Sequence, residues 1–237
     1  MGHTKSTSVN TGYHLPKPFS SISVNNFPVN TIPASITGVK SDRYNLWQLG
    51  NAGLSEIAFN YAIKGLGYLN AANIITKRNI VSIVDFSKPS TQKRLFVIDL
   101  SSGKILFNTW VAHGRNSGNE YANEFSNLPE SHQTSLGFYI TMGTYTGGNG
   151  YSLRLQGCEK GINDKAFERA IVIHGADYVS NRFINSRGML GRSYGCPAIP
   201  TELSKKIIDV IKNGSCIFLY HPTKKYCTRS KIITSQV

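Results

Sequence analysis

Short apolar runs separated by turn residues dominate the chain after about residue 80, and they constrain its fold more than any other feature. Each run has the length of a strand and ends near Gly, Ser, Asn or Asp, so each predicts a β-strand. The predicted strands cover residues 80–86, 95–100, 105–111, 136–142, 151–155, 170–174 and 216–220. Ser101-Ser102-Gly103 predicts a hairpin turn, and residues 143–150 are predicted to form a loop rich in Gly and Thr. The expected fold class is mainly β with a few helices.

Two amphipathic helices are predicted beside these strands. The first has apolar residues at helical spacing, and Gly65 and Gly67 are predicted to end it. Its stripe consists of Leu54, Ile57, Ala58 and Tyr61. The second begins at Pro200-Thr201-Glu202 and ends before Gly214. Its stripe consists of Leu203, Ile207, Val210 and Ile211.

The first 45 residues differ in composition from the rest of the chain. Ser, Thr, Asn and Pro dominate them, and four of the nine prolines fall between Pro16 and Pro33. Such a segment buries little apolar surface, so residues 1–45 are predicted to form a linker or a strap. Residues 46–225 are predicted to form one domain, and residues 226–237 a basic tail. Met1-Gly2-His3 lacks the pattern of a secretion signal.

The charge of the chain favours an anionic partner. It has 26 Lys and Arg against 13 Asp and Glu, a formal net charge of +13. This excess favours nucleic acid, anionic lipid or an acidic cell-wall polymer. No zinc-finger spacing, RNP-type aromatic motif or basic-leucine pattern is present, so nucleic acid is not the expected partner. No apolar run approaches the roughly 18 residues of a membrane span, so no transmembrane segment is expected.

The four cysteines lie in different surroundings. Cys158, Cys196, Cys216 and Cys227 form no C-x-x-C pair, so a structural zinc site is not expected. Cys216 lies in an apolar run and is predicted to be a buried core thiol. Cys158 lies in a loop where it could be exposed. A framework of two disulfides is a further option, but it would leave no thiol for catalysis, and we do not favour it.

One pair of residues points to thiol chemistry. The apolar run Ile171-Val172-Ile173 ends in His174-Gly175, and Cys196 follows in the turn Ser193-Tyr194-Gly195-Cys196-Pro197. An imidazole can take the proton of a nearby thiol and produce a thiolate–imidazolium pair. Gly195 allows a tight turn whose N–H groups face a developing oxyanion. The alternatives are a hydrogen-bonded structural histidine at a strand end and an inert buried thiol.

These residues resemble the signature of YkuD-like L,D-transpeptidases, and in particular the murein L,D-transpeptidase catalytic domain branch. The shared elements are His174-Gly175 and, after a similar gap, Gly191-Arg192-Ser193-Tyr194-Gly195-Cys196-Pro197-Ala198. Further similar blocks are residues 111–118, 135–139 and 151–155. The likeness extends from about Leu54 to Tyr220. It departs from the wider family at Tyr194, where a histidine is usual, and at Ala198, where an asparagine is usual.

The resemblance implies a β-sandwich or barrel-like catalytic fold and an enzyme that processes peptidoglycan. Cys196 would be the nucleophile that forms a thioester with the stem peptide, and His174 the general base. The main-chain carbonyl of Gly175 would orient the imidazole. Backbone N–H groups of Tyr194, Gly195 and Cys196 would form the oxyanion hole. An amine of a second stem would then resolve the thioester.

The same resemblance implies the setting of the reaction. The expected partners are peptidoglycan stem peptides, the expected location is the periplasm or cell envelope, and carbapenems are expected to acylate the thiol. We expect no metal, no cofactor and a monomer. The secretion signal of an exported protein is expected to be absent from this sequence. An L,D-carboxypeptidase that uses water as acceptor, and a non-catalytic basic wall-binding module, remain as alternatives.

Four residues are predicted to contact the substrate. Arg192 would bind a stem carboxylate, because Arg pairs with carboxylates in a bidentate manner. Ser193 and Tyr194 lie in the cysteine turn, and Tyr151 follows the glycine-rich loop, where it would line the groove. The alternatives are an exposed loop arginine for Arg192 and a core aromatic for Tyr151. His113 is predicted to be structural.

Overall fold

The computed structural model describes residues 39–235, with side chains from residue 43 onward. The segment 1–45, predicted as a linker or strap, lies almost entirely outside the described residues. Only its last part is seen, in helix α1 (Val39–Leu46). A short 3-10 turn, η2 (Leu49–Ala52), follows it.

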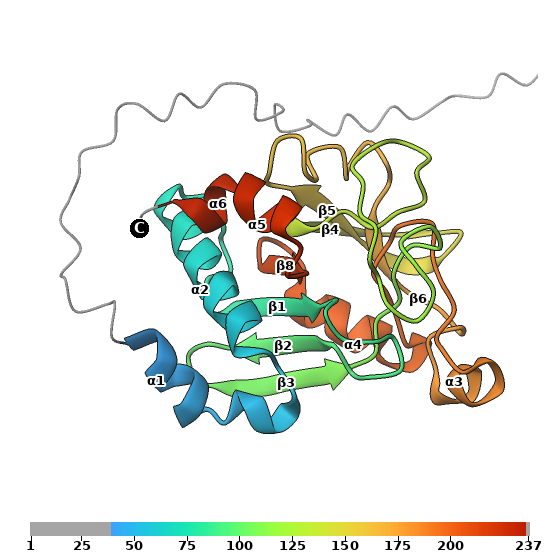
Figure 1. Ribbon diagram of the computed structural model, residues 1–237, viewed down its shortest axis with the longest axis horizontal. Coiled ribbons are helices and arrows are strands. Elements are labelled where there is room, and N and C mark those ends of the chain that lie inside the picture. The colour runs from blue at the N-terminus through green and yellow to red at the C-terminus, as the bar shows by residue number, and fades with distance from the viewer. Residues whose placement is uncertain (1–38, 236–237) are drawn as a thin grey trace, which may run out of the picture. The chain divides into compact units, whose positions relative to one another are not determined.

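One eight-stranded sheet forms the centre of the domain, in the order β3-β2-β1-β8-β4-β5-β6-β7 (Figure 1). Its strands are β1 (Ile80–Asp85), β2 (Leu95–Asp99), β3 (Lys104–Thr109), β4 (Gly137–Gly147), β5 (Gly150–Gly157), β6 (Val172–Gly175), β7 (Ala198–Ile199) and β8 (Cys216–Tyr220). Just beyond β3, Ala112 N–H donates to the carbonyl of Ala198 in β7 at 2.8 Å. This bond links the two edges, so the sheet is nearly closed and barrel-like, which confirms the predicted fold class.

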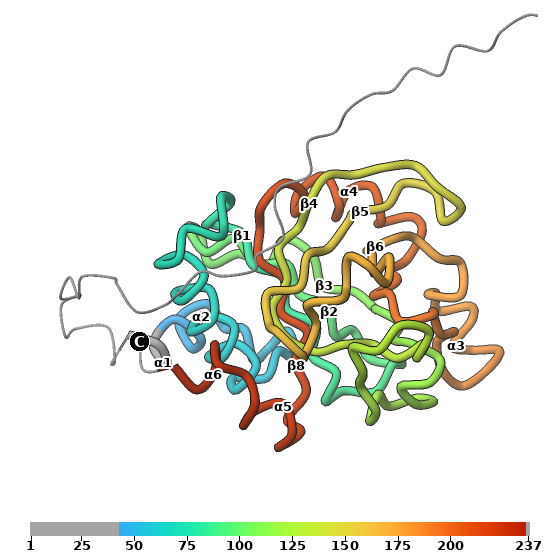
Figure 2. Tube along the Cα trace, turned by 90° about the horizontal axis from the view of Figure 1, so that it is seen from above, coloured from blue at the N-terminus to red at the C-terminus, as the bar shows by residue number. Residues whose placement is uncertain are grey.

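Helices gather at one end of the described domain. Figures 1 and 2 place α1, α2 (Glu56–Ala71), α5 (Lys224–Arg229) and α6 (Lys231–Thr234) there. Strand β6 and helix α3 (Asn181–Arg187) lie towards the opposite end. Helix α4 (Thr201–Ile211) packs beside β5 and β6. No helix in residues 39–235 is both long enough and apolar enough to cross a membrane.

The helix around residue 60 differs from its prediction. It continues through Gly65 and Gly67 to Ala71, and Ile57 of the predicted stripe is 58% exposed. The buried face instead consists of Ala58, Phe59, Ala62, Gly65, Leu66 and Leu69. Gly65 does not end the helix because its role is close packing: a Cβ there would lie 2.1 Å from the ring of Phe138.

We expect alanine at the two glycines of α2 to have opposite effects. Gly65→Ala should lower the free energy of unfolding by about 1–3 kcal/mol, since the methyl group overpacks the Phe138 contact. Gly67→Ala is the matched control. It is exposed with no heavy atom within 4 Å of its Cβ position, so it should raise that free energy by about 0.5–1 kcal/mol. Urea unfolding measures both, and equal effects would contradict the packing role.

The structure confirms the second predicted helix but not the loop predicted at 143–150. Helix α4 covers residues 201–211 with Ile207 and Ile211 buried, as predicted. The predicted loop at 143–150 was wrong except at residues 148–149, because β4 continues to Gly147, where it pairs with Gly150 at the start of β5. Thr and Tyr alternate in this stretch, and both favour strands.

The C-terminal segment packs on the domain, at least to residue 235. Tyr226, Ile232 and Ile233 are buried, although residues 226–237 were predicted to form a basic tail. The carboxylate of the buried Glu159 accepts hydrogen bonds from Phe138 N–H at 2.8 Å, Tyr226 Oη at 3.1 Å and Ser230 Oγ. This carboxylate therefore fastens α5 and α6 to the sheet.

Candidate active site

Two adjacent strands bring His174 and Cys196 to the same part of the sheet. Strands β6 and β7 are parallel, with His174 opposite Ala198, and Cys196 lies two residues before Ala198. Val172, two residues before His174, donates its N–H to Cys196 Sγ at 3.5 Å. Cys196 itself lies in the turn that leads into β7. The turn that carries Cys196 therefore lies beside β6, the strand that carries His174.

The hydrogen bond of His174 determines its tautomer. Its Nδ1 lies 3.0 Å from the carbonyl oxygen of Gly175. A carbonyl oxygen only accepts, so Nδ1 carries the proton and Nε2 keeps a lone pair. Burial lowers the pKa of His174, while the bond to Gly175 raises it by a smaller amount. The imidazole is therefore neutral near pH 7 and has a free basic nitrogen.

The thiol of Cys196 has backbone partners in this structure. It accepts from Val172 N–H and donates to the carbonyl of Ala170 at 3.7 Å, and no hydrogen bond joins it to His174 within the described residues. Burial raises the pKa of the Cys196 thiol, while the Val172 N–H and Arg169 lower it by smaller amounts. With one pKa raised and the other lowered, the resting pair is a thiol and a neutral imidazole. The thiolate–imidazolium pair stays a prediction.

The pH dependence of alkylation follows from these shifts. We expect the rate of Cys196 alkylation by iodoacetamide to rise with pH, with an apparent pKa above the value of about 8.5 for a free cysteine. The sign follows because only the thiolate reacts, and burial disfavours it. Peptide mass spectrometry of Cys196 measures the rate, with N-acetylcysteine as the control thiol. Rapid alkylation that is already constant at pH 6 would contradict this expectation.

The turn before Cys196 is fixed by its own hydrogen bonds. Ser193 Oγ donates to the carbonyl of Cys196 at 2.6 Å and accepts from Gly195 N–H at 3.0 Å. Gly195 has a φ angle of 120°, which residues with a side chain rarely adopt. Ser193 is buried and acts within the turn. Because the N–H of Gly195 is already used, the candidate oxyanion donors narrow to the N–H groups of Tyr194 and Cys196.

Arg169 lies beside this turn, and sequence reasoning missed it. Its guanidinium donates to the carbonyls of Gln133 at 2.6 Å and Ser126 at 2.8 Å. Its Nη2 is 3.3 Å from the Cβ position of Gly195. Only the fold reveals this role, because Arg169 precedes β6 in the sequence with no motif around it. It supplies positive charge near Cys196 and braces the loop around Gln133.

Arg192 and Tyr194 have distinct surroundings. Arg192 Nη1 donates to the carbonyls of Arg115 and Gly118 and to Asn119 Oδ1, at 3.2, 3.0 and 2.8 Å. It therefore holds the 115–119 loop. Tyr194 is 65% exposed. The centre of its ring is 5.0 Å from the guanidinium carbon of Arg115 and 4.7 Å from the centre of the His132 ring.

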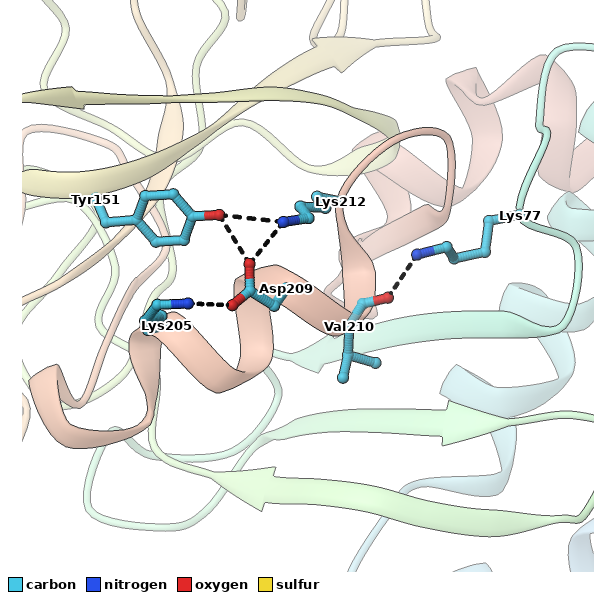
Figure 3. Close-up of polar contacts among 6 residues, drawn as sticks. All are labelled: Lys77, Tyr151, Lys205, Asp209, Val210 and Lys212. Carbon is cyan, nitrogen blue, oxygen red and sulfur yellow. Dashed lines mark hydrogen bonds and ion pairs between the residues drawn. The ribbon is translucent and has the colours of Figure 1, made fainter.

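Tyr151 lies on the other face of the sheet. Its hydroxyl donates to the Asp209 carboxylate at 2.8 Å. The ammonium of Lys212 donates to both the Tyr151 hydroxyl and the Asp209 carboxylate (Figure 3). Asp209 belongs to α4, and Lys212 is the residue that follows the end of this helix. Its neighbour Ser152 pairs with His174, and successive side chains point to opposite faces, so Tyr151 points away from His174. The structure thus corrects the prediction that Tyr151 lines the groove, and we do not propose that Tyr151 contacts the substrate.

A buried cation supports the loops around the cysteine turn. Arg94 is fully buried and donates to the carbonyls of Val111 and Lys88. It also donates to His113 Nδ1 at 2.8 Å, so the proton of His113 is on Nε2, which faces the Gly118 carbonyl. Burial beside Arg94 lowers the pKa of His113 to about 3. His113 is therefore neutral and structural, and its carbonyl accepts from Ser193 N–H at 2.9 Å.

The other cysteines are unsuited to nucleophilic attack. All four cysteines are free, so no disulfide framework is formed. Cys216 is buried in β8, as predicted. Cys158 packs against the core, and burial raises its pKa well above the ordinary value, so it is not an exposed loop thiol. Among the described residues, no cluster of three or more His, Cys, Asp or Glu is placed to hold a metal ion.

The fold and this cysteine turn agree with one family. A family model of the L,D-transpeptidase catalytic domain (YkuD_2) matches residues 50–220. The chain therefore belongs to the L,D-transpeptidase catalytic domain family. The comparison with curated proteins gives no significant match.

Solved structures of L,D-transpeptidases are similar to this chain at low identity. The enzyme from Mycobacterium smegmatis is 12% identical with a TM-score of 0.38, over 60% of this chain and 59% of its own. One from Stackebrandtia nassauensis is 15% identical with a TM-score of 0.37, over 70% and 68%. The helical cell shape determining protein Pgp2 from Campylobacter jejuni is 18% identical with a TM-score of 0.41, over 68% and 54%. The matched region spans about three fifths of the length of the first of these relatives.

Proposed function

We propose that this protein is a peptidoglycan L,D-transpeptidase in which Cys196 is the nucleophile and His174 the general base. The observation that carries this proposal is the hydrogen bond of His174 Nδ1 to the Gly175 carbonyl, beside the Cys196 turn. It leaves Nε2 as a base in a chain whose family is that of L,D-transpeptidases. The reaction takes place in the cell envelope, where the stem peptides are.

The proposed acylation moves one proton at each step. His174 Nε2 takes the proton of Cys196 Sγ as the sulfur attacks the carbonyl carbon of the third stem residue. The N–H groups of Tyr194 and Cys196 stabilise the resulting oxyanion. The C–N bond to the D-residue then breaks, and His174 gives its proton to the leaving amine. A thioester on Cys196 remains.

The proposed second half-reaction restores the thiol. The amine of a second stem attacks the thioester carbonyl and gives a proton to His174. The C–S bond breaks, and the sulfur takes that proton. Because the resting pair is neutral, as the opposite pKa shifts of Cys196 and His174 indicate, proton transfer accompanies the attack rather than precedes it.

Incubation with a tetrapeptide donor tests this function. We expect intact-mass analysis to show a thioester adduct on Cys196, and muropeptide digests to show cross-linked dimers joined between two third residues. Trimmed tripeptides without dimers would assign the chain to the L,D-carboxypeptidases instead. A folded protein that forms no adduct with the donor or with a carbapenem would contradict the enzymatic proposal and favour a wall-binding module.

A further inference from the structure

The sheet face that carries His174 also carries an arginine that the proposed reaction does not use. In the pairing of β5 with β6, Ser152 is opposite His174 and Arg154 is opposite Val172. Successive side chains alternate between faces, so Arg154 lies on the same face as His174. Leu153 and Ile173, between these pairs, are buried on the other face.

A cavity of about 260 Å³ opens beside this arginine. Its lining residues come from β4, β5, the segment before β6 and the first residue of β6: Tyr145, Arg154, Phe167, Ala170, Ile171 and Val172. Two of these residues, Ala170 and Val172, are the ones whose backbone atoms contact Cys196 Sγ, at 3.7 and 3.5 Å. The cavity therefore shares Ala170 and Val172 with the surroundings of the Cys196 thiol.

The guanidinium of Arg154 is oriented but has no polar partner. It stacks on the ring of Tyr145, with its central carbon 3.9 Å from the ring centre. Within the described residues it makes no hydrogen bond, and the ion pairs found there involve Lys205, Lys212 and Asp209. Stacking covers the face of the guanidinium and leaves the N–H groups along its edge open. That edge matches the two oxygens of a carboxylate.

We propose that Arg154 and this cavity form a subsite that binds a carboxylate of the donor stem peptide; this inference rests on the proposed function. A donor stem has two carboxylates near the bond that breaks. One is at the end of the diaminopimelate side chain of the acylating residue, and the other is the terminus of the leaving D-residue. Phe167, which is 42% exposed, provides an apolar wall for the carbon chain that carries the carboxylate.

The test combines two variants with three donors. The variants are Arg154→Gln and Arg154→Lys, and the control is Arg78→Gln, an exposed arginine before β1. The donors are a diaminopimelate tetrapeptide, the same peptide amidated at its terminus, and the same peptide amidated on the side-chain carboxylate. Mass spectrometry of the acyl-enzyme gives kcat/KM and KM for each combination, and thermal unfolding and iodoacetamide alkylation verify the fold.

For the fully acidic donor, we expect Arg154→Gln to lower kcat/KM by about tenfold to a hundredfold, mainly through KM, because a charge-assisted hydrogen bond is lost. Arg154→Lys should lower kcat/KM by a smaller factor, and Arg78→Gln should leave kcat/KM unchanged. In the wild type, amidation of the carboxylate that Arg154 binds should lower kcat/KM by a similar factor. In Arg154→Gln, amidation of that same carboxylate should leave kcat/KM unchanged. The donor that shows this pattern identifies which carboxylate binds.

Two results would overturn the subsite. The first is an Arg154→Gln protein that acylates like the wild type with all three donors. The second is a loss that stays the same size for every donor, since that would show a structural role. Failure of the wild type to form an acyl-enzyme with any donor is a different result, and it would overturn the proposed function together with the subsite.

Discussion

Replacing Cys196 with alanine is expected to abolish acyl-enzyme formation completely while the protein stays folded. The other thiols in the described structure are poorly suited to take its place. Cys216 is buried in the core, Cys158 packs against the core, Cys227 is partly buried, and burial raises the pKa of all three. The loss should exceed the factor of about 100–10,000 expected for His174→Gln, which removes only the base. Intact-mass analysis after incubation with a tetrapeptide donor measures the effect.

Cys227→Ala is the matched control for this variant. Cys227 is a partly buried free thiol in α5, at the helical end of the domain, and its loss should leave acylation unchanged. An adduct that persists in Cys196→Ala, or disappears in Cys227→Ala, would assign the nucleophile elsewhere. Thermal unfolding of both variants separates a chemical effect from a loss of folded protein.

Replacing Arg94 with leucine should have the largest effect on stability. The guanidinium is fully buried, and its loss leaves the carbonyls of Val111 and Lys88 and the Nδ1 of His113 without their donor. Burial lowers the pKa of Arg94 to about 9, so the group is charged at neutral pH. Unpaired buried polar groups are costly, and we expect the free energy of unfolding to fall by about 3–5 kcal/mol.

Urea unfolding of Arg94→Leu and of Lys93→Leu measures this difference. Lys93 is the exposed neighbour of Arg94, with its ammonium 5.8 Å from the ring of Trp110, and its replacement should change the free energy of unfolding by about 1 kcal/mol or less. A loss below about 1 kcal/mol for Arg94→Leu would show that the cation is not the support of the loops around Gly118.

The strands could be predicted from sequence because local pattern determines them. Runs such as 216–220 are apolar throughout and are bounded by turn residues, and β8 is indeed buried along its whole length. Helix α2 was harder to predict because the meaning of Gly65 depends on a residue far along the chain. Gly65 lies inside the helix, where the ring of Phe138 occupies the space of its missing Cβ. Sequence spacing does not contain that contact.

The residues of the candidate site also differ in whether the sequence alone could predict them. The motif pointed to His174 and Cys196, and the structure places His174 in β6 and Cys196 in the turn that leads into the adjacent strand β7. Arg169 and Arg154 were not predicted as site residues, since their roles arise from strand pairing and loop packing. A signal did exist for Arg154: it alternates with Leu153 and Leu155, so it is a charged residue on the face of a strand opposite the core. Tyr151 was misplaced because its direction depends on that same alternation.

The neutral resting state of the pair also affects how the protein tolerates oxidants. Peroxides attack the thiolate form of cysteine, and the first product is a sulfenic acid. A thiol whose pKa is raised by burial and which donates to the Ala170 carbonyl presents little thiolate between reactions. We therefore expect Cys196 to react slowly with peroxides in the resting protein and, under the proposed mechanism, to become reactive when a bound acyl donor draws its proton towards His174.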